Sequence, residues 1–173
     1  MFQCFYPGKI EDSTYVIPYE NWKKMGIQGI IYDIDNTLVP HGAPADDRAI
    51  KLFEHLKELG LKTCLLSNNK EPRVKSFADQ VKSPEKIGER FIENAHKPAV
   101  RNYQKAMELL GTDCSNTVFI GDQLFTDILG ANRLGIQTVL VKPINPKEEI
   151  QIVLKRYLEK PVLYCYRKSL KKG

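Results

Sequence analysis

Two aspartates, Asp33 and Asp35, stand one residue apart at the end of an apolar run that begins at Ile30. The run is β-branched and aromatic with no polar face, so it predicts a buried strand. In strand geometry both carboxylates lie on one side of the chain and Ile34 lies on the other. Like charges held this close repel, and a bound cation or a shared proton relieves the repulsion. Oxygen ligands without thiolates favour a hard ion such as Mg²⁺.

Three later clusters of polar residues also follow apolar runs. Ser67 and Asn68 end one run, Lys97 comes after a second, and Asp122 and Asp127 come after a third. Taken alone, each cluster has a plain structural explanation, as a turn, a surface lysine or a helix cap. Ligands of an open parallel sheet bind at the carboxyl ends of its strands, and all four clusters fall at such ends. Their joint occurrence favours one shared site.

The elements that must position these residues alternate between strand-like and helix-like periodicity. This alternation predicts an α/β fold, a doubly wound parallel sheet with helices on both faces. The expected strands are the run ending near Asp33 and then 61–66, 91–92, 117–120 and 137–141; the expected helices are 46–59, 71–80, 99–110, 123–134 and 148–158.

Length and composition suit a single domain spanning residues 1–173, because 173 residues with 42% hydrophobic content can build one core. We expect that core at about residues 26–141. A lead-in of residues 1–25, with a helix at 19–25, precedes it, and a C-terminal helix and basic tail at 146–173 follow it.

The composition excludes several classes of protein. No apolar run reaches eighteen residues, and the first residues lack the pattern of a signal peptide. The cysteines are scattered without a paired motif, so they predict neither a zinc site nor a disulfide framework, and they indicate a reducing compartment. We therefore expect a cytoplasmic protein. The cysteines are Cys4, Cys64, Cys114 and Cys165.

The net charge of +5 is mild and is most uneven in the tail from Arg167 to Gly173, which follows Tyr164 and Tyr166. A frayed, solvated end is the simplest interpretation of this tail. The alternative is a weak anchor that holds the protein peripherally at anionic lipid headgroups. Binding to nucleic acid is not expected.

The four clusters resemble the four motifs of the haloacid dehalogenase (HAD) superfamily of phosphatases. Motif one corresponds to Asp33 through Thr37, motif two to Ser67, motif three to Lys97, and motif four to Asp122 with Asp127. The chain resembles the YqeG-type group of subfamily IIIA more closely than the superfamily at large, through its Asp-Asn-Thr-Leu-Val, Ser-Asn-Asn and Gly-Asp-Gln-Leu-Phe-Thr-Asp segments. That group is similar in turn to mitochondrial phosphatidylglycerophosphate phosphatases of phospholipid metabolism.

The resemblance implies a Mg²⁺-dependent phosphomonoesterase in which Asp33 attacks phosphorus and forms an aspartyl-phosphate. Asp35 would act as general acid and then as base, and Lys97 would supply positive charge to the phosphoryl group. The metal would be held by Asp33, the Asp35 carbonyl and Asp122, while Asp127 acts through water or on Lys97.

The remaining motif residues have supporting roles in the same scheme. Ser67 and the backbone amide of Asn68 would donate hydrogen bonds to phosphoryl oxygens, and Thr37 would orient its loop. The roles of Asn69, His41 and Arg133 stay open, as does that of residues 1–25.

The intervals between the motifs are too short for a separate cap domain. A capless site favours a large or surface-presented substrate. The resemblance implies phosphatidylglycerophosphate; a phosphoprotein, a nucleotide or a sugar phosphate is the alternative.

Two other classes of protein compete with a phosphatase. A receiver-type signalling domain lacks the Asp-x-Asp pair and the Gly-Asp cluster after the lysine, and both are present here. A non-catalytic HAD-like binding protein would be expected to lose a motif carboxylate, and none is lost. Magnesium-dependent turnover would separate the enzyme from the binding protein.

Overall fold

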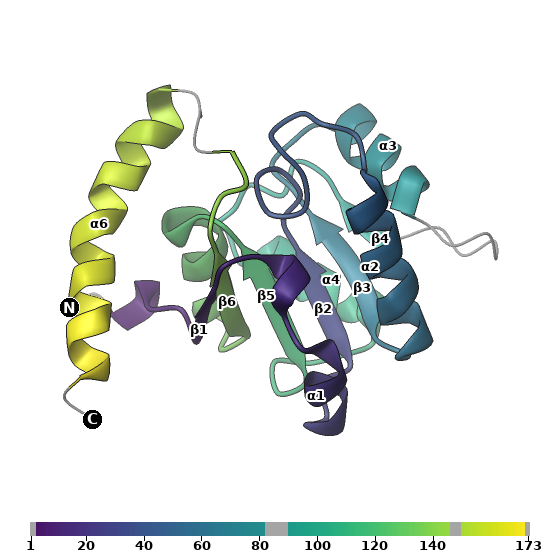
Figure 1. The fold of residues 1–173 in the computed structure, drawn as a ribbon, viewed down its shortest axis with the longest axis horizontal. Helices are drawn as coiled ribbons and strands as arrows, with labels where there is room; N and C mark the ends of the chain where they lie inside the picture. The colour runs from purple at the N-terminus through teal and green to yellow at the C-terminus, as the bar shows by residue number, and fades with distance from the viewer. Residues whose placement is uncertain (1–2, 82–89, 146–149, 172–173) are drawn as a thin grey trace.

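A computed structural model describes residues 3–81, 90–145 and 150–171 (Figure 1). Six parallel strands form one sheet in the order β1-β6-β5-β2-β3-β4. The predicted parallel α/β sheet is therefore confirmed. The strands are β1 (Lys9–Glu11), β2 (Gly29–Tyr32), β3 (Lys62–Leu66), β4 (Arg90–Ile92), β5 (Thr117–Gly121) and β6 (Gln137–Val141).

Helices cover both faces of the sheet (Figure 1). One face packs against α1 (Tyr19–Lys24), α2 (Asp47–Glu58) and α3 (Glu71–Val81), and the other against α4 (Arg101–Leu110) and α5 (Leu129–Asn132). Ile30 and Tyr32 of β2 belong to the first core and Ile31 belongs to the second, as the alternation of side chains along a strand requires. The chain also contains the short helices η1 (Gln3–Phe5), η2 (Thr14–Val16) and η3 (Leu124–Ile128), and the C-terminal α6 (Ile150–Leu170).

The helix boundaries have local causes. The Asp46 carboxylate accepts a hydrogen bond from the Ala49 amide at 2.9 Å and so caps the start of α2. Gly111 ends α4 with a φ of 63°, a left-handed conformation that costs glycine little. These signals explain why the predicted α2 and α4 are confirmed to within about two residues.

The sequence did not predict β1. It has only three residues, of which Ile10 alone is apolar, so no alternation was visible. Its register is set from outside, by parallel pairing with Val139, Leu140 and Val141 of β6.

The helix predicted at 123–134 is confirmed as a helical segment over residues 124–132, but it is not one regular α-helix. The structure has a π-helical turn, η3, followed by the four-residue α5. In the loop before it, the Asp122 and Gln123 amides donate to the Asp127 carboxylate at 3.2 and 3.1 Å. The side chain of Asp127 thus satisfies amides that a regular first turn would leave open.

The last helix is longer than predicted, and the prediction of a frayed end is wrong as far as Leu170. The sequence indicated 148–158, whereas α6 continues to Leu170 and residues 146–149 lie outside the described part of the chain. Val162 and Tyr166 are buried against other elements, and the Tyr166 ring packs edge to face on Tyr6 at 5.4 Å. This support comes from residues distant in sequence. Within the described residues, no helix is both long and apolar enough to span a membrane.

Candidate active site

A cavity of about 190 Å³ opens at the carboxyl ends of the strands. β2 and β5 are neighbours in the sheet, and the strands that follow each of them in sequence are added on opposite sides. The cavity therefore lies at the position where open α/β sheets bind ligands. Its lining comes from five segments distant in sequence: Asp33, Asp35, Asn36, His41, Ser67, Asn68, Asn69, Lys97, Gln123, Thr126, Ile152 and Lys155. Thr37, Asp122 and Asp127 do not line it and are buried beside it.

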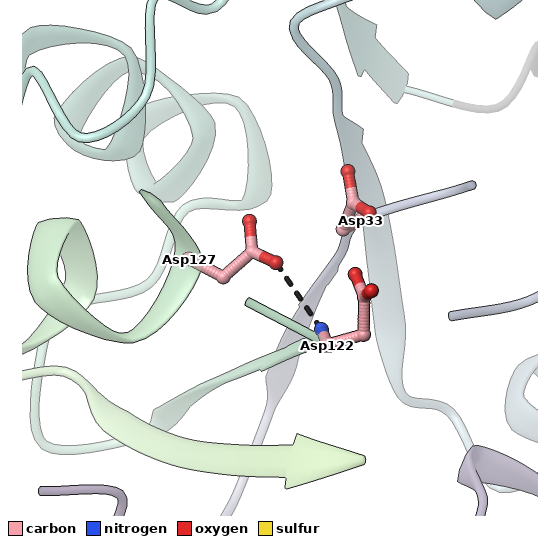
Figure 2. Close-up of side chains that lie close together, drawn as sticks. All are labelled: Asp33, Asp122 and Asp127. Carbon is pink, nitrogen blue, oxygen red and sulfur yellow. Dashed lines mark hydrogen bonds between the residues drawn. The ribbon is translucent and has the colours of Figure 1, made fainter. Parts of the chain in front are cut away.

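Lys97 joins two of the carboxylates. Its Nζ lies 2.6 Å from Asp33 Oδ1 and 2.7 Å from Asp127 Oδ1, and all three residues are buried. Figure 2 shows Asp33, Asp122 and Asp127 gathered around one space, and the Asp122 backbone nitrogen donates a hydrogen bond to the Asp127 carboxylate. One lysine thus forms ion pairs with two carboxylates, one that follows β2 and one in η3.

Burial and crowding shift the ionisation of this cluster. Desolvation raises the pKa of Asp33 from 3.8 to about 7, with the Asp127 charge adding to the shift and Lys97 opposing it. Desolvation, with the charges of Asp127 and Asp33, also raises the pKa of Asp122, against the opposing effect of Arg156. The two nearby carboxylates hold the pKa of Lys97 above its usual range despite its burial. The cluster therefore favours additional positive charge.

Arg156, from α6, binds Asp122. Its guanidinium donates to the Asp122 carboxylate and to the Asp122 backbone carbonyl, and it lies 3.2 Å from Glu159. Glu159 in turn accepts from the Leu124 amide at 2.7 Å. On the other side, the Thr37 hydroxyl donates to Asp122 at 3.3 Å. The fourth motif is therefore held both by the first motif and by the C-terminal helix.

A glycine permits the close approach of Asp127 to β5. A Cβ on Gly121 would lie 2.5 Å from an Asp127 carboxylate oxygen, closer than atoms can pack. Glycine at the end of β5 thus lets the carboxylate reach the amides of the following turn.

Asp35 is fixed by donors that the sequence did not identify. The Arg73 guanidinium and the Gly42 backbone amide donate to Oδ1 at 3.0 and 2.6 Å. The Asn69 side-chain amide donates to Oδ2 at 2.5 Å. His41 lies further away, with Nδ1 3.9 Å from the same carboxylate. Arg73 and Asn69 therefore set the position of Asp35, and Arg73 had no local signal because it lies on a helix among other charged residues.

The second motif serves partly as a frame for Lys97. The Asn68 side chain accepts from the Lys97 amide at 2.7 Å, and the Ser67 hydroxyl accepts from the Asn69 amide at 3.2 Å. Ser67 is buried at the cavity wall, while Asn68 is exposed at its rim. Arg133, whose role was open, is exposed at the end of α5 and does not line the cavity.

The residues present fit a divalent cation. One oxygen each of Asp33, Asp122 and Asp127 lies within 4.8 Å of the others, and all three groups are buried. Three carboxylates face the two cationic side chains of Lys97 and Arg156, so the cluster keeps negative charge. A buried, oxygen-only donor set with excess negative charge suits a hard ion such as Mg²⁺.

Comparison with known proteins identifies the family to which the chain belongs. Residues 41–135 match the model of haloacid dehalogenase-like hydrolases, which is more than half of the chain. The chain therefore belongs to the haloacid dehalogenase-like hydrolase family.

Two curated relatives refine this placement. The chain is 39% identical to "Probable phosphatase YqeG" of Bacillus subtilis, over 95% of this chain and 93% of that protein. It is 27% identical to "Phosphatidylglycerophosphate phosphatase 1, chloroplastic/mitochondrial" of Arabidopsis thaliana, over 95% of this chain but about half (51%) of that protein. These likenesses support a phosphatase of the YqeG type.

The fold is also similar to a solved structure, the cobalt-bound deoxy-D-mannose-octulosonate 8-phosphate phosphatase of Haemophilus influenzae. The TM-score is 0.52 at 14% identity, over 85% of this chain and 93% of that one. At this identity the likeness concerns the fold alone.

Proposed function

We propose that the protein is a Mg²⁺-dependent phosphomonoesterase that acts through an aspartyl-phosphate on Asp33. The observation that carries the proposal is the Asp33 carboxylate at the cavity, 2.6 Å from Lys97 and beside Asp122 and Asp127. A carboxylate that attacks a phosphate must have the repulsion between the two offset, and nearly all catalysis of phosphoryl transfer is positioning and charge stabilisation. Lys97 provides one such charge. Asp33, Asp122 and the Asp35 carbonyl would hold Mg²⁺, which would supply the other.

The residues define two chemical steps. An Asp33 oxygen forms a bond to phosphorus while the bond from phosphorus to the ester oxygen breaks, and Asp35 delivers a proton to the departing oxygen. Water then attacks phosphorus, Asp35 accepts its proton, and the bond from Asp33 to phosphorus breaks to release inorganic phosphate. Because Asp35 Oδ1 accepts bonds from Arg73 and Gly42, the proton must reside on Oδ2 or displace a donor.

We further propose phosphatidylglycerophosphate as the substrate, taken from a membrane surface. The likeness to the Arabidopsis thaliana protein supports this choice. The open surroundings also support it: among the described residues, only a loop, α2 and β3 separate the first two motifs, and only α3 and β4 separate the next two. A site without a covering domain can reach a headgroup that stays in its bilayer.

The test measures phosphate release from phosphatidylglycerophosphate in mixed micelles and from p-nitrophenyl phosphate, with and without Mg²⁺. We expect Mg²⁺-dependent release from the lipid, and Asp33→Asn should lower turnover by more than about 10⁴-fold because the nucleophile is lost. The exposed Asp12→Asn is the matched control and should leave turnover unchanged.

Each alternative has its own outcome. Substantial turnover by Asp33→Asn contradicts the nucleophile assignment. Turnover of p-nitrophenyl phosphate alone keeps the mechanism and rejects the lipid, which directs the search to phosphoproteins, nucleotides and sugar phosphates. No turnover of any ester favours a non-catalytic binding protein.

A further inference from the structure

One face of α6 exposes a continuous apolar stripe. Leu154, Tyr157, Leu158 and Tyr164 each keep between 61% and 67% of their surface exposed, and Pro161 between them is also exposed. At 3.6 residues per turn these positions occupy an arc of about 120°. Isolated exposed apolar residues are common, whereas a stripe along three turns of one helix indicates a contact surface.

The exposed charges of α6 around this stripe are positive. Lys160 lies beside it, with its ammonium 4.3 Å from the centre of the Tyr157 ring, and Arg167 and Lys168 are exposed toward the C-terminal end. Glu159 is the one acidic residue between Ile150 and Leu170, and it is buried on the opposite face. An apolar stripe with basic and aromatic edges is complementary to an anionic bilayer surface, where aromatic rings and lysine side chains reach from the acyl boundary to the headgroups.

The same helix is tied to the active site. Val162 and Glu159 pack inward, and Arg156 holds Asp122. Ile152 and Lys155 form part of the cavity wall, one helical turn or less from Leu154 and Leu158. Figure 1 shows α6 along the β1 side of the molecule, with one flank turned away from the sheet. The N-terminal end of the stripe therefore lies at the same level of α6 as the cavity wall.

We propose that the exposed face of α6, defined by Leu154, Tyr157, Leu158, Pro161 and Tyr164, docks on an anionic lipid bilayer and brings the cavity to its surface. A bilayer suits this face better than an acidic protein does, because the stripe is apolar at its centre and basic at its edges. As a way to reach a lipid substrate the proposal rests on the proposed function, but docking itself can be measured without turnover.

The experiment is co-sedimentation of the full-length protein with two kinds of vesicle, one of phosphatidylcholine alone and one of an equal mixture with phosphatidylglycerol. We expect binding to the anionic vesicles only. The double variant Leu154→Ser/Leu158→Ser should weaken binding by at least about tenfold, because it removes two apolar side chains that the bilayer would bury. Lys160→Gln should weaken it by about fivefold, the share of one basic residue.

The matched control is Met25→Ser/Leu109→Ser, which removes two exposed apolar side chains from α1's end and α4. It should bind vesicles as the unmodified protein does. Hydrolysis of p-nitrophenyl phosphate in solution should be equal in all variants, which shows that they are folded.

Three results would overturn docking: no binding to anionic vesicles, equal binding to both kinds, or full binding by the Leu154→Ser/Leu158→Ser variant. A dimer in light scattering that this variant dissociates would assign the face to a second copy of the chain instead. Failure of the proposed function looks different, because the protein would then bind anionic vesicles without releasing phosphate from phosphatidylglycerophosphate.

Discussion

The active site joins two regions that are built in different ways. The ends of β2 and β5 lie inside the sheet, where hydrogen-bonded strands fix Asp33 and Asp122. The helix α6 lies outside the sheet, and it reaches the same site through Arg156 and Lys155. The interior region carries the reacting groups. The exterior region carries positive charge that compensates them. The contact between α6 and Asp122 and the binding of a metal at the site should therefore depend on each other.

The largest effect that tests this dependence is expected from Arg156→Gln. Removing one partner of a buried ion pair leaves Asp122 uncompensated and should lower the unfolding free energy of the metal-free protein by about 3 kcal/mol. A divalent cation can take over that compensation, so Mg²⁺ should raise the melting temperature more in the variant than in the unmodified protein. Differential scanning calorimetry with and without Mg²⁺ measures both effects.

The control for Arg156→Gln is Arg167→Gln, an exposed basic residue of the same helix. It should change neither stability nor the response to Mg²⁺. An equal response to Mg²⁺ in all three proteins would show that α6 and the metal site are independent.

A second arginine tests the interior region, because Arg73 holds Asp35 from α3. Arg73→Ala should lower kcat by about 10²-fold, since a misplaced general acid and base loses much of its contribution. KM should change little, because Arg73 is not part of the cavity lining. The pH profile of kcat should shift as well, which loss of stability alone would not cause.

Arg73→Lys is the conservative comparison and should recover part of the rate, because the charge remains while the fork-shaped donor is lost. The exposed Lys75→Ala on the same helix is the surface control and should leave kcat unchanged. Wild-type kcat in Arg73→Ala would reject a positioning role.

The Gly121→Ala substitution tests how closely β5 and Asp127 must approach. The added Cβ would overlap the Asp127 carboxyl, so we expect a loss of about 1 to 3 kcal/mol in unfolding free energy together with reduced turnover. Adding Asp127→Ala removes the overlapping atoms. Gly121→Ala should therefore cost less unfolding free energy in the Asp127→Ala background than in the unmodified protein, and activity should not return, as urea unfolding and phosphate release would show. If Gly121→Ala is as stable as the unmodified protein, the close approach has no energetic consequence.

The two regions also differ in how far the sequence predicts them. Asp33, Ser67, Lys97 and Asp122 each follow a predicted strand, and parallel strands necessarily bring such positions to one edge. The structure accordingly places Asp33, Ser67 and Lys97 in the wall of one cavity, and Asp122 is buried beside it. The sheet order, the role of β1 and the length of α6 depend on contacts between distant segments, which no local pattern contains.

The residues that sequence reasoning missed share a property. Arg73 and Arg156 are arginines on amphipathic helices, where a basic residue normally faces solvent. Only the folded structure shows that they turn toward Asp35 and Asp122. The sequence thus predicted the carboxylates but not the side chains that hold two of them.

The last expected effect is a dependence of stability on pH. In the metal-free folded protein the pKa of Asp33 is raised from 3.8 to about 7, and that of Asp122 is raised as well. Between these pH values the folded state holds protons that the unfolded state has released. The unfolding free energy should therefore fall as pH rises from about 4 to about 7, by at most about 1.4 kcal/mol per pH unit for each such proton.

Mg²⁺ should reduce this decline, because a cation beside the carboxylates favours their ionised form and lowers their pKa. Urea unfolding at about pH 4.5 and about pH 7.5, with and without Mg²⁺, measures the slope. Asp33→Asn removes one titrating group and should flatten the metal-free slope, whereas Asp12→Asn should not. A metal-free protein whose stability rises over this range would mean that Lys97 and Arg156 already compensate the buried carboxylates. The interior region would then need no further cation, and the case for a metal at this site would lose its electrostatic basis.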